Sequence, residues 1–195
     1  MSAHTSPPST PRPERRVRVL LDRAVSASAG LVALSALGVS LYQAILSRQQ
    51  QRMSVWPYVM QYNSFPEGRY QRLVQNAGLG PALVGGFEVL VDGKPQRRWN
   101  DVVRALTGVG DSTLTYGSLP SGTVLLPGVT HQLLELRAGP TATAVYRGVN
   151  RDRLRTRVCF CSLYRDCWIA DSEARTPTPV RACEAAMDST RAFEQ

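Results

Sequence analysis

Residues 24–47 read AVSASAGLVALSALGVSLYQAILS, an uncharged run that Arg23 and Arg48 enclose. At a rise of 1.5 Å per residue, a helix of this length exceeds the ~20 residues that cross a ~30 Å hydrocarbon core. Serines dilute the Leu, Val and Ile residues, but their hydroxyls can bond back to helix carbonyls, which makes them tolerable in lipid. The run therefore predicts one transmembrane helix over 24–47.

This run has three other interpretations. A cleaved signal peptide has a short apolar core followed by a small-residue cleavage site, whereas this run is long and its Ala27-Ser28-Ala29 triplet comes early. A buried core helix carries its apolar residues on one stripe, and here they lie all round. An interfacial helix needs a strongly charged face, which the run lacks. The spanning anchor is favoured, and cleavage is the closest alternative.

The arginines near the two ends of the run predict its orientation. Five arginines precede the run, and Arg48 and Arg52 follow it closely. This bias predicts a single-pass protein of the inner (cytoplasmic) membrane, with its N-terminus in the cytoplasm and its larger C-terminal part periplasmic or extracellular. Ala36, Ser40 and Ala44 recur at four-residue spacing, which permits two helices to approach closely and suggests a homodimer.

Composition divides the rest of the chain. Residues 1–23 begin with a Pro-, Ser- and Thr-rich stretch that has little to bury, and they are expected to form a disordered cytoplasmic tail. Residues 48–53 are expected to form a short polar stalk and residues 54–171 one β-sandwich domain. Residues 172–195 return to Ser, Thr, Pro and Ala and predict an extended C-terminal tail.

The chain is basic, with a formal net charge of +8, and Lys94 is the one lysine among its 23 basic residues. Arginine preference of this kind is typical of a GC-rich genome. A basic balance favours anionic partners, and for a membrane-tethered chain lipid headgroups are nearer than nucleic acid. The bilayer is therefore the expected partner through residues 24–47, together with an envelope protein that the sequence does not identify, and no nucleic acid is expected.

Short strand-like runs separated by Gly, Pro, Asn and Asp fill the domain. In the first, Trp56, Tyr58, Met60 and Tyr62 share one face, and Asp92-Gly93 later marks a hairpin. The expected strands are 54–62, 70–75, 83–91 (alternating through Leu83, Phe87, Val89 and Val91), 124–126, 129–136, 154–163 and 167–170, with one helix over 101–106 capped by Asn100. This spacing predicts a mainly β fold, an immunoglobulin-like sandwich. The glycines between Asn76 and Pro81 lead into a strand and not a helix, so they predict a turn and not a phosphate loop.

Four cysteines, Cys159, Cys161, Cys167 and Cys183, are the most specific feature of the domain. An even number outside the cytoplasm indicates disulfides. In the strand 154–163, alternation places Cys159 and Cys161 on the outer face, opposite Val158 and Phe160. Cys167 follows a turn that returns it close to Cys161, and Cys183 can return to Cys159. Of the three possible pairings, Cys161–Cys167 with Cys159–Cys183 is favoured.

Metal binding and thiol redox chemistry are the alternatives for these cysteines. Four thiolates would suit zinc, but the usual pair of C-x-x-C knuckles is absent, as is the C-x-x-C of thiol-exchange proteins. Structural disulfides are therefore preferred, with no metal site and no cofactor expected.

Arg151, Arg153, Arg155 and Arg157 share the outer face with these cysteines and form an aligned positive stripe. It is either a solvated face or a contact for an anionic surface. His131 shares parity with apolar neighbours, which favours a packed or surface residue over a general base, and no G-x-S-x-G elbow occurs. No enzyme activity is expected.

Three motifs carry a resemblance: Ser54-Val55-Trp56-Pro57-Tyr58, then Asn76-x-Gly78-x-Gly80-Pro81-Ala82, then Cys159-Phe160-Cys161-Ser162 with Cys167-Trp168. Behind an anchor helix, this order resembles an uncharacterised family of small single-pass bacterial envelope proteins over roughly residues 48–183. The resemblance implies architecture and no activity. Trp168 is expected to pack on the disulfide beside it.

The expected function is thus that of a non-enzymatic, membrane-anchored, extracytoplasmic module that binds another protein or organises the membrane surface. The alternative is a metal-binding or thiol redox protein that uses Cys159, Cys161, Cys167 and Cys183.

Overall fold

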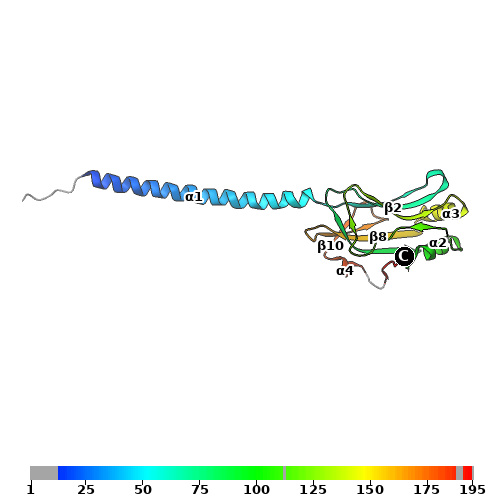
Figure 1. Ribbon diagram of the computed structural model, residues 1–195. Helices are drawn as coiled ribbons and strands as arrows, with labels where there is room; N and C mark the ends of the chain where they lie inside the picture. The colour runs from blue at the N-terminus through cyan, green and yellow to red at the C-terminus, as the bar shows by residue number, and fades with distance from the viewer. Residues whose placement is uncertain (1–12, 112, 188–190, 195) are drawn as a thin grey trace, which may run out of the picture. The chain divides into compact units, whose positions relative to one another are not determined.

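The computed structural model describes residues 13–111, 113–187 and 191–194. The chain divides into two compact units, the first ending at Gln50 and the second beginning at Gln51. Figure 1 shows a long helix in the first and a β-rich domain in the second. The coarse prediction of an N-terminal apolar helix followed by a β domain is therefore confirmed.

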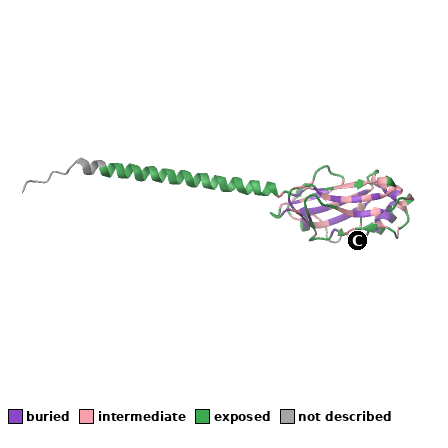
Figure 2. Cartoon of the chain, turned by 45° about the horizontal axis from the view of Figure 1, so that its top comes forward, coloured by how far each residue is buried: buried purple, intermediate pink, exposed green. Residues whose placement is uncertain are grey.

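The long helix is α1 (Pro13–Ser54). It is the one helix within the described residues that is long and apolar enough to cross a membrane, and a signal sequence would meet the same criteria. From residue 18 onward its side chains are all exposed (Figure 2), unlike those of a core helix. As expected, its serines bond back to the helix: the Oγ atoms of Ser35 and Ser40 each donate to a carbonyl four residues earlier at 2.8 Å. These bonds leave the hydroxyls satisfied within the helix.

Two antiparallel sheets build the domain. The first has four strands in the order β1-β2-β7-β5, namely β1 (Val59–Ser64), β2 (Tyr70–Asn76), β7 (Thr130–Leu136) and β5 (Thr115–Tyr116). A short 3-10 turn, η1 (Pro66–Gly68), connects β1 to β2. The second sheet has six strands, of which five follow the order β10-β9-β8-β3-β4, namely β10 (Thr178–Val180), β9 (Cys167–Asp171), β8 (Leu154–Cys161), β3 (Ala82–Val91) and β4 (Lys94–Gln96), and β6 (Val124–Leu125) pairs with the start of β3.

One hydrophobic core lies between the sheets. Val74 of β2 and Leu134 of β7 belong to the same buried cluster as Val89 of β3 and Phe160 of β8, and Figure 2 shows the buried positions along the strands of both sheets. The helices α2 (Trp99–Thr107) and α3 (Pro140–Val149) add apolar residues to this core. A last short helix, α4 (Cys183–Ala186), belongs to the C-terminal segment.

The predicted hairpin at Asp92-Gly93 is confirmed. Val91 of β3 pairs with Lys94 of β4, and both turn residues have positive φ, 49° and 76°. This is the backbone that a tight hairpin turn requires and that Asp-Gly sequences favour.

Several finer predictions were wrong. α1 continues to Ser54, so the first strand begins at Val59, and Val59 is buried while Trp56 and Met60 are exposed. The face that carries Trp56 and Met60 is thus the more exposed face of this strand. In β3 the register shifts between Val84 and Gly86. This bulge makes Val84, and not Leu83, share the core with Phe87.

The helix predicted over 101–106 lies within α2, but its cap was predicted wrongly. α2 begins at Trp99 with Arg98 as its N-cap, and no side chain caps it. The Oδ1 atom of Asn100 instead accepts a hydrogen bond from the backbone N–H of Asp111 at 3.2 Å. α3 was not predicted. The C-terminal tail contains β10 and α4, so it has more regular structure than expected.

Candidate functional site

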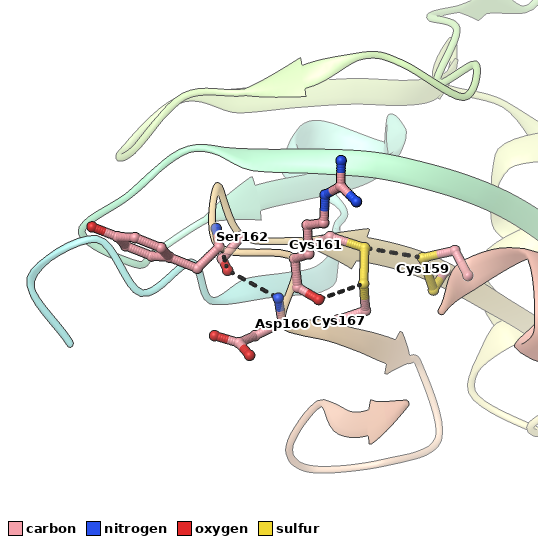
Figure 3. Close-up of a disulfide and its surroundings, with 8 residues drawn as sticks. Cys159, Cys161, Ser162, Asp166 and Cys167 are labelled. Carbon is pink, nitrogen blue, oxygen red and sulfur yellow. Dashed lines mark hydrogen bonds between the residues drawn. A yellow bond between two sulfur atoms is a disulfide. The ribbon is translucent and has the colours of Figure 1, made fainter. Parts of the chain in front are cut away.

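The four cysteines form two disulfides on the outer face of β8. Cys159 is bonded to Cys183 and Cys161 to Cys167, which is the pairing favoured from strand parity. Cys161 of β8 lies directly opposite Cys167 of β9, with the two Cα atoms 4.0 Å apart. Figure 3 shows this disulfide beside Ser162 and Asp166 of the connecting turn.

The turn between β8 and β9 is held by Ser162. Its Oγ accepts hydrogen bonds from the backbone N–H groups of Tyr164 at 3.2 Å and Asp166 at 3.3 Å, while its own N–H donates to the Asp166 carbonyl at 2.8 Å. A serine hydroxyl that satisfies turn amides fixes the turn geometry. This turn brings Cys167 back beside Cys161.

The second disulfide attaches the C-terminal segment to the sheet. Cys159 points away from the core, yet it is fully buried because Cys183 and Met187 cover it. The segment lies close against the bulge of β3: a Cβ atom added at Gly85 would stand 2.5 Å from the Cβ of Cys183. The bulge thus makes room for the disulfide, a role that the sequence signals only as a Gly85-Gly86 pair.

The two disulfides lie in contact. The Sγ atoms of Cys161 and Cys183 are 3.7 Å apart, and those of Cys161, Cys167 and Cys183 all lie within 4.8 Å of one another. Once reduced, such a cluster offers thiolates at a separation that suits a soft or borderline metal ion such as Zn²⁺. In the disulfide form the four sulfurs are bonded in two pairs, and none is a thiolate.

Trp168 does not pack on the disulfides as predicted. It faces the other side of β9, where its ring stacks on Phe160 at 5.8 Å and meets Trp56 at 6.4 Å. Alternation along β9 explains this, because Cys167 and Ile169 face the disulfide side and Trp168 therefore faces the core.

The arginine stripe is paired with carboxylates. Arg153 makes two hydrogen bonds to Asp92, of 2.9 and 2.7 Å. Arg155 lies 2.6 Å from Asp171 and 3.2 Å from Glu173, and Arg157 lies 2.8 Å from Glu88. Arg151 and Arg153 both precede β8, and Arg151 is exposed. The surface is a row of ion pairs instead of a bare positive stripe, so its geometry does not favour the predicted contact with an anionic surface.

These pairs shift the ionisation of their members. The hydrogen bonds from Arg153 hold the pKa of Asp92 below its usual range, and the same contacts raise the pKa of Arg153. The hydrogen bonds of Arg155 to Asp171 raise the pKa of its guanidinium. The arginines therefore remain charged and committed to their carboxylates.

A buried arginine, Arg72, lies between the two sheets and was not singled out from the sequence. Only 3% of it is exposed. Its guanidinium donates to Asn63 Oδ1 at 2.9 Å, to Gln61 Oε1 at 3.2 Å and to the Thr156 hydroxyl. The last of these contacts joins β2 to β8 across the core. The sequence signalled this burial through strand parity, since Arg72 lies on the same face of β2 as the buried Tyr70 and Val74.

The neutral partners of Arg72 leave its charge without strong compensation. Burial lowers the pKa of Arg72, and burial likewise raises the pKa of Tyr70 to about 12. Tyr70 donates its hydroxyl to Asn63 Oδ1 at 2.8 Å, so both side chains share one acceptor. This polar group is a specific link between the sheets, made at a desolvation cost.

The cavities that open on the domain include a small one and a larger one. One, of about 160 Å³, lies between β1 and the segment after β9, with Gln61, Ala170 and Arg175 in its wall. The other, of about 450 Å³, lies where the C-terminal segment crosses β3 and includes Phe87 and Phe193. His131 of β7 lines neither, which agrees with a packed or surface role.

Comparison with protein-family models and with curated proteins found no match. The site is therefore interpreted from its own geometry.

Proposed function

We propose that the protein is a single-pass membrane protein whose disulfide-bonded β domain lies outside the cytoplasm and acts as a non-enzymatic interaction module. The observation that carries this proposal is a combination of two features. Within α1 an uncharged run lies between Arg23 and Arg48, and all four cysteines of the domain are in disulfides. Disulfides persist in oxidising compartments and are rare in the cytoplasm. The helix and the disulfides thus both favour a topology in which the β domain lies outside the cytoplasm.

The orientation is supported independently by the arginine distribution. The five arginines before residue 24 favour a cytoplasmic N-terminus. The inner membrane, with a periplasmic or extracellular domain, is the location that we propose. The resemblance to small bacterial envelope proteins agrees with it.

The immunoglobulin-like architecture belongs to the same proposal. Two antiparallel sheets that share one core support a sandwich. In this domain both disulfides lie on the outer side of one sheet, whereas an immunoglobulin disulfide crosses the core.

We propose an interaction role for the domain. Asp92 and Asp171 are engaged by arginines, so neither of these carboxylates is free to act as a general acid or base. The unidentified partner is proposed to be another envelope protein.

The topology is tested with reporter fusions at the C-terminus of the full chain. A periplasmically active reporter such as alkaline phosphatase should be active, and a reporter that is fluorescent only in the cytoplasm should be dark. A chain with Arg15, Arg16 and Arg18 replaced by Gln is the matched variant, since it removes much of the bias. The reverse pattern in the unmodified chain would refute the proposed orientation.

The contact between the two disulfides favours a second candidate function, thiol exchange. A dithiol reductant that opens Cys161–Cys167 becomes oxidised and leaves two thiols. The Cys161 thiolate, 3.7 Å from the Sγ of Cys183, can then attack it, form Cys161–Cys183 and release Cys159 as a thiolate. Alkylation followed by mass spectrometry of the partly reduced chain would detect this pairing. If Cys161–Cys183 is never found, and the fully reduced chain does not bind Zn²⁺, the cysteines are structural.

A further inference from the structure

One end of the domain is defined by the start of β3 and the end of β8. Leu83 pairs with Cys161 at this end, and Val91 pairs with Leu154 at the other, beside the Asp92-Gly93 turn. The first end also holds the β8–β9 turn, because β8 and β9 are antiparallel. The end of β2 and the start of β1 lie there too, since Asn76, which pairs with Val59, donates from its side chain to the carbonyls of Gly80 and Leu125 beside the start of β3.

Three loops come together at this end through contacts with Trp56, Asn76 and Arg52. The carbonyl of Trp56 accepts the N–H of Leu79 at 2.9 Å, and the carbonyl of Asn76 accepts the N–H of Gly128 at 2.7 Å. Tyr164, in the β8–β9 turn, has the guanidinium of Arg52 over its ring at 5.8 Å. The segment 52–58 and the loops 77–81, 126–129 and 162–166 therefore share one end of the domain.

These loops expose large apolar side chains. Leu79 is 74% exposed and Leu163 is 58% exposed. We define the Trp56 surface as Trp56, Leu79, Leu126, Val129, Leu163 and Tyr164. Among the described residues from 55 onward, the other exposed large apolar side chains are Met60, Val109, Tyr116 and Val124. Such a concentration of exposed apolar side chains on one part of a soluble domain indicates an interaction surface.

The short distance along the chain between the membrane-spanning run and Trp56 indicates what the Trp56 surface contacts. α1 continues for seven residues from Ser47 to Ser54, which is about 10 Å of helix rise. The headgroup region adds about 5–8 Å to each side of the hydrocarbon core, so the end of α1 extends about 2–5 Å beyond its outer edge. Trp56, two residues after α1, is thus expected close to the headgroups of the membrane that the chain crosses.

The side chains of the Trp56 surface and the charges around it are of the kinds that contact lipid headgroups. Trp and Tyr are the side chains enriched at the membrane–water interface. Arg52 and Arg165 are exposed around them, and the one acid of the β8–β9 turn, Asp166, is half-buried. Positive side chains around an apolar and aromatic centre complement anionic headgroups.

We propose that the Trp56 surface rests on the headgroup region of the bilayer that α1 spans, so that the domain lies on the membrane instead of standing free on a stalk. This inference depends on the proposed membrane anchoring. In that arrangement the far end, with α2, α3 and the Asp92-Gly93 turn, faces away from the membrane.

The test uses the full chain in vesicles of equimolar phosphatidylcholine and phosphatidylglycerol whose acyl chains carry bromine near the headgroup. In a Trp56→Phe background, Leu163→Trp places a fluorophore on the Trp56 surface. Val109→Trp is the matched control, because Val109 is 62% exposed and follows α2 at the far end. We expect a blue-shifted emission and a loss of intensity for Leu163→Trp, and neither change for Val109→Trp.

The Trp56→Phe chain alone supplies the background from Trp99 and Trp168. Extraction of the vesicles with alkaline carbonate tests the anchor separately. A chain that stays in the membrane but shows equal quenching at both positions overturns the lipid contact alone and leaves the surface to a protein partner. A chain that carbonate releases overturns the anchor, and the lipid contact with it.

Discussion

The Sγ atom of Cys161 lies 3.7 Å from the Sγ atom of Cys183, although each belongs to a different disulfide. The outer face of β8 thus carries one continuous sulfur cluster, which joins β8 to β9 and the C-terminal segment to β8. Because this segment covers Cys159, the disulfides also create a second, small apolar cluster outside the main core.

The two disulfides should stabilise the domain unequally. Cys159–Cys183 closes a separation of 24 residues and Cys161–Cys167 one of 6. Loop-closure entropy assigns about 3 kcal/mol to the longer link and about 2 kcal/mol to the shorter. We expect Cys159→Ser/Cys183→Ser to lower the free energy of unfolding more than Cys161→Ser/Cys167→Ser. Urea unfolding of the full chain in detergent, followed by fluorescence, measures both, and the reverse ranking would contradict the entropic account.

Gly85 should tolerate no side chain. A Cβ there would stand 2.5 Å from the Cβ and 2.6 Å from the Sγ of Cys183, so Gly85→Ala must displace the disulfide segment at a cost of about 1–3 kcal/mol. Gly139→Ala is the control, because its Cβ would meet nothing closer than 3.9 Å. Urea midpoints and the fraction of chains with both disulfides should fall for Gly85→Ala alone. Equal values for the two variants would rule out this close approach.

Two arginines of the paired row should differ in their contribution to stability. Arg157 lies 2.8 Å from Glu88, of which 2% is exposed, and Arg157→Gln withdraws the guanidinium from a buried carboxylate at a cost of about 3 kcal/mol. Arg153 pairs with the exposed Asp92, and Arg153→Gln should cost much less, because water screens an exposed ion pair. Urea unfolding of the two variants at neutral pH compares them. Similar losses would show that burial of Glu88 does not decide the effect.

Regular alternation made the outer face of β8 predictable. Leu154, Thr156, Val158 and Phe160 are all buried, as parity requires, and this also brought Cys161 opposite Cys167. Prediction from strand alternation failed where an irregular residue interrupts the alternation or where the strand starts at a different residue. The helix end at Ser54 moved the start of the first strand to Val59, and the bulge at Gly85–Gly86 changed the buried residue at the start of β3 from Leu83 to Val84.

Other features depended on contacts between segments that are distant in sequence. Arg72 would ordinarily be assigned to solvent, and its burial depends on hydrogen-bond acceptors on β1 and on Thr156 of the facing sheet. The carboxylates that pair with the arginine row come from β3, β9 and the residues after them. Sequence spacing along β8 alone contains no information about these partners.

The small-residue stripe of α1 provides a test of self-association. The hydroxyl of Ser40 donates to the Ala36 carbonyl at 2.8 Å. This hydroxyl is therefore satisfied within its own helix, and the surface at Ala36, Ser40 and Ala44 carries only small side chains. If two helices approach at Ala36, Ser40 and Ala44, Ser40→Leu should reduce dimer formation severalfold, because a large side chain separates the backbones. Leu41→Ile, one residue away, should not. Chemical cross-linking in membranes reports the dimer fraction, and an unchanged yield for Ser40→Leu would exclude this face.

Tyr70 should make the domain sensitive to alkali. Its pKa is raised from 10.0 to about 12, chiefly by burial. A phenol whose folded pKa exceeds its unfolded value contributes stability that is complete below pH 10 and disappears as the pH rises through about 12. The shift corresponds to about 2–3 kcal/mol. Tyr70→Phe removes the titrating group, while Asn63 Oδ1 keeps its hydrogen bond from Arg72. In urea unfolding across this pH range, stability of the unmodified chain should fall more steeply than that of Tyr70→Phe. Parallel curves would show that Tyr70 titrates normally and is open to water.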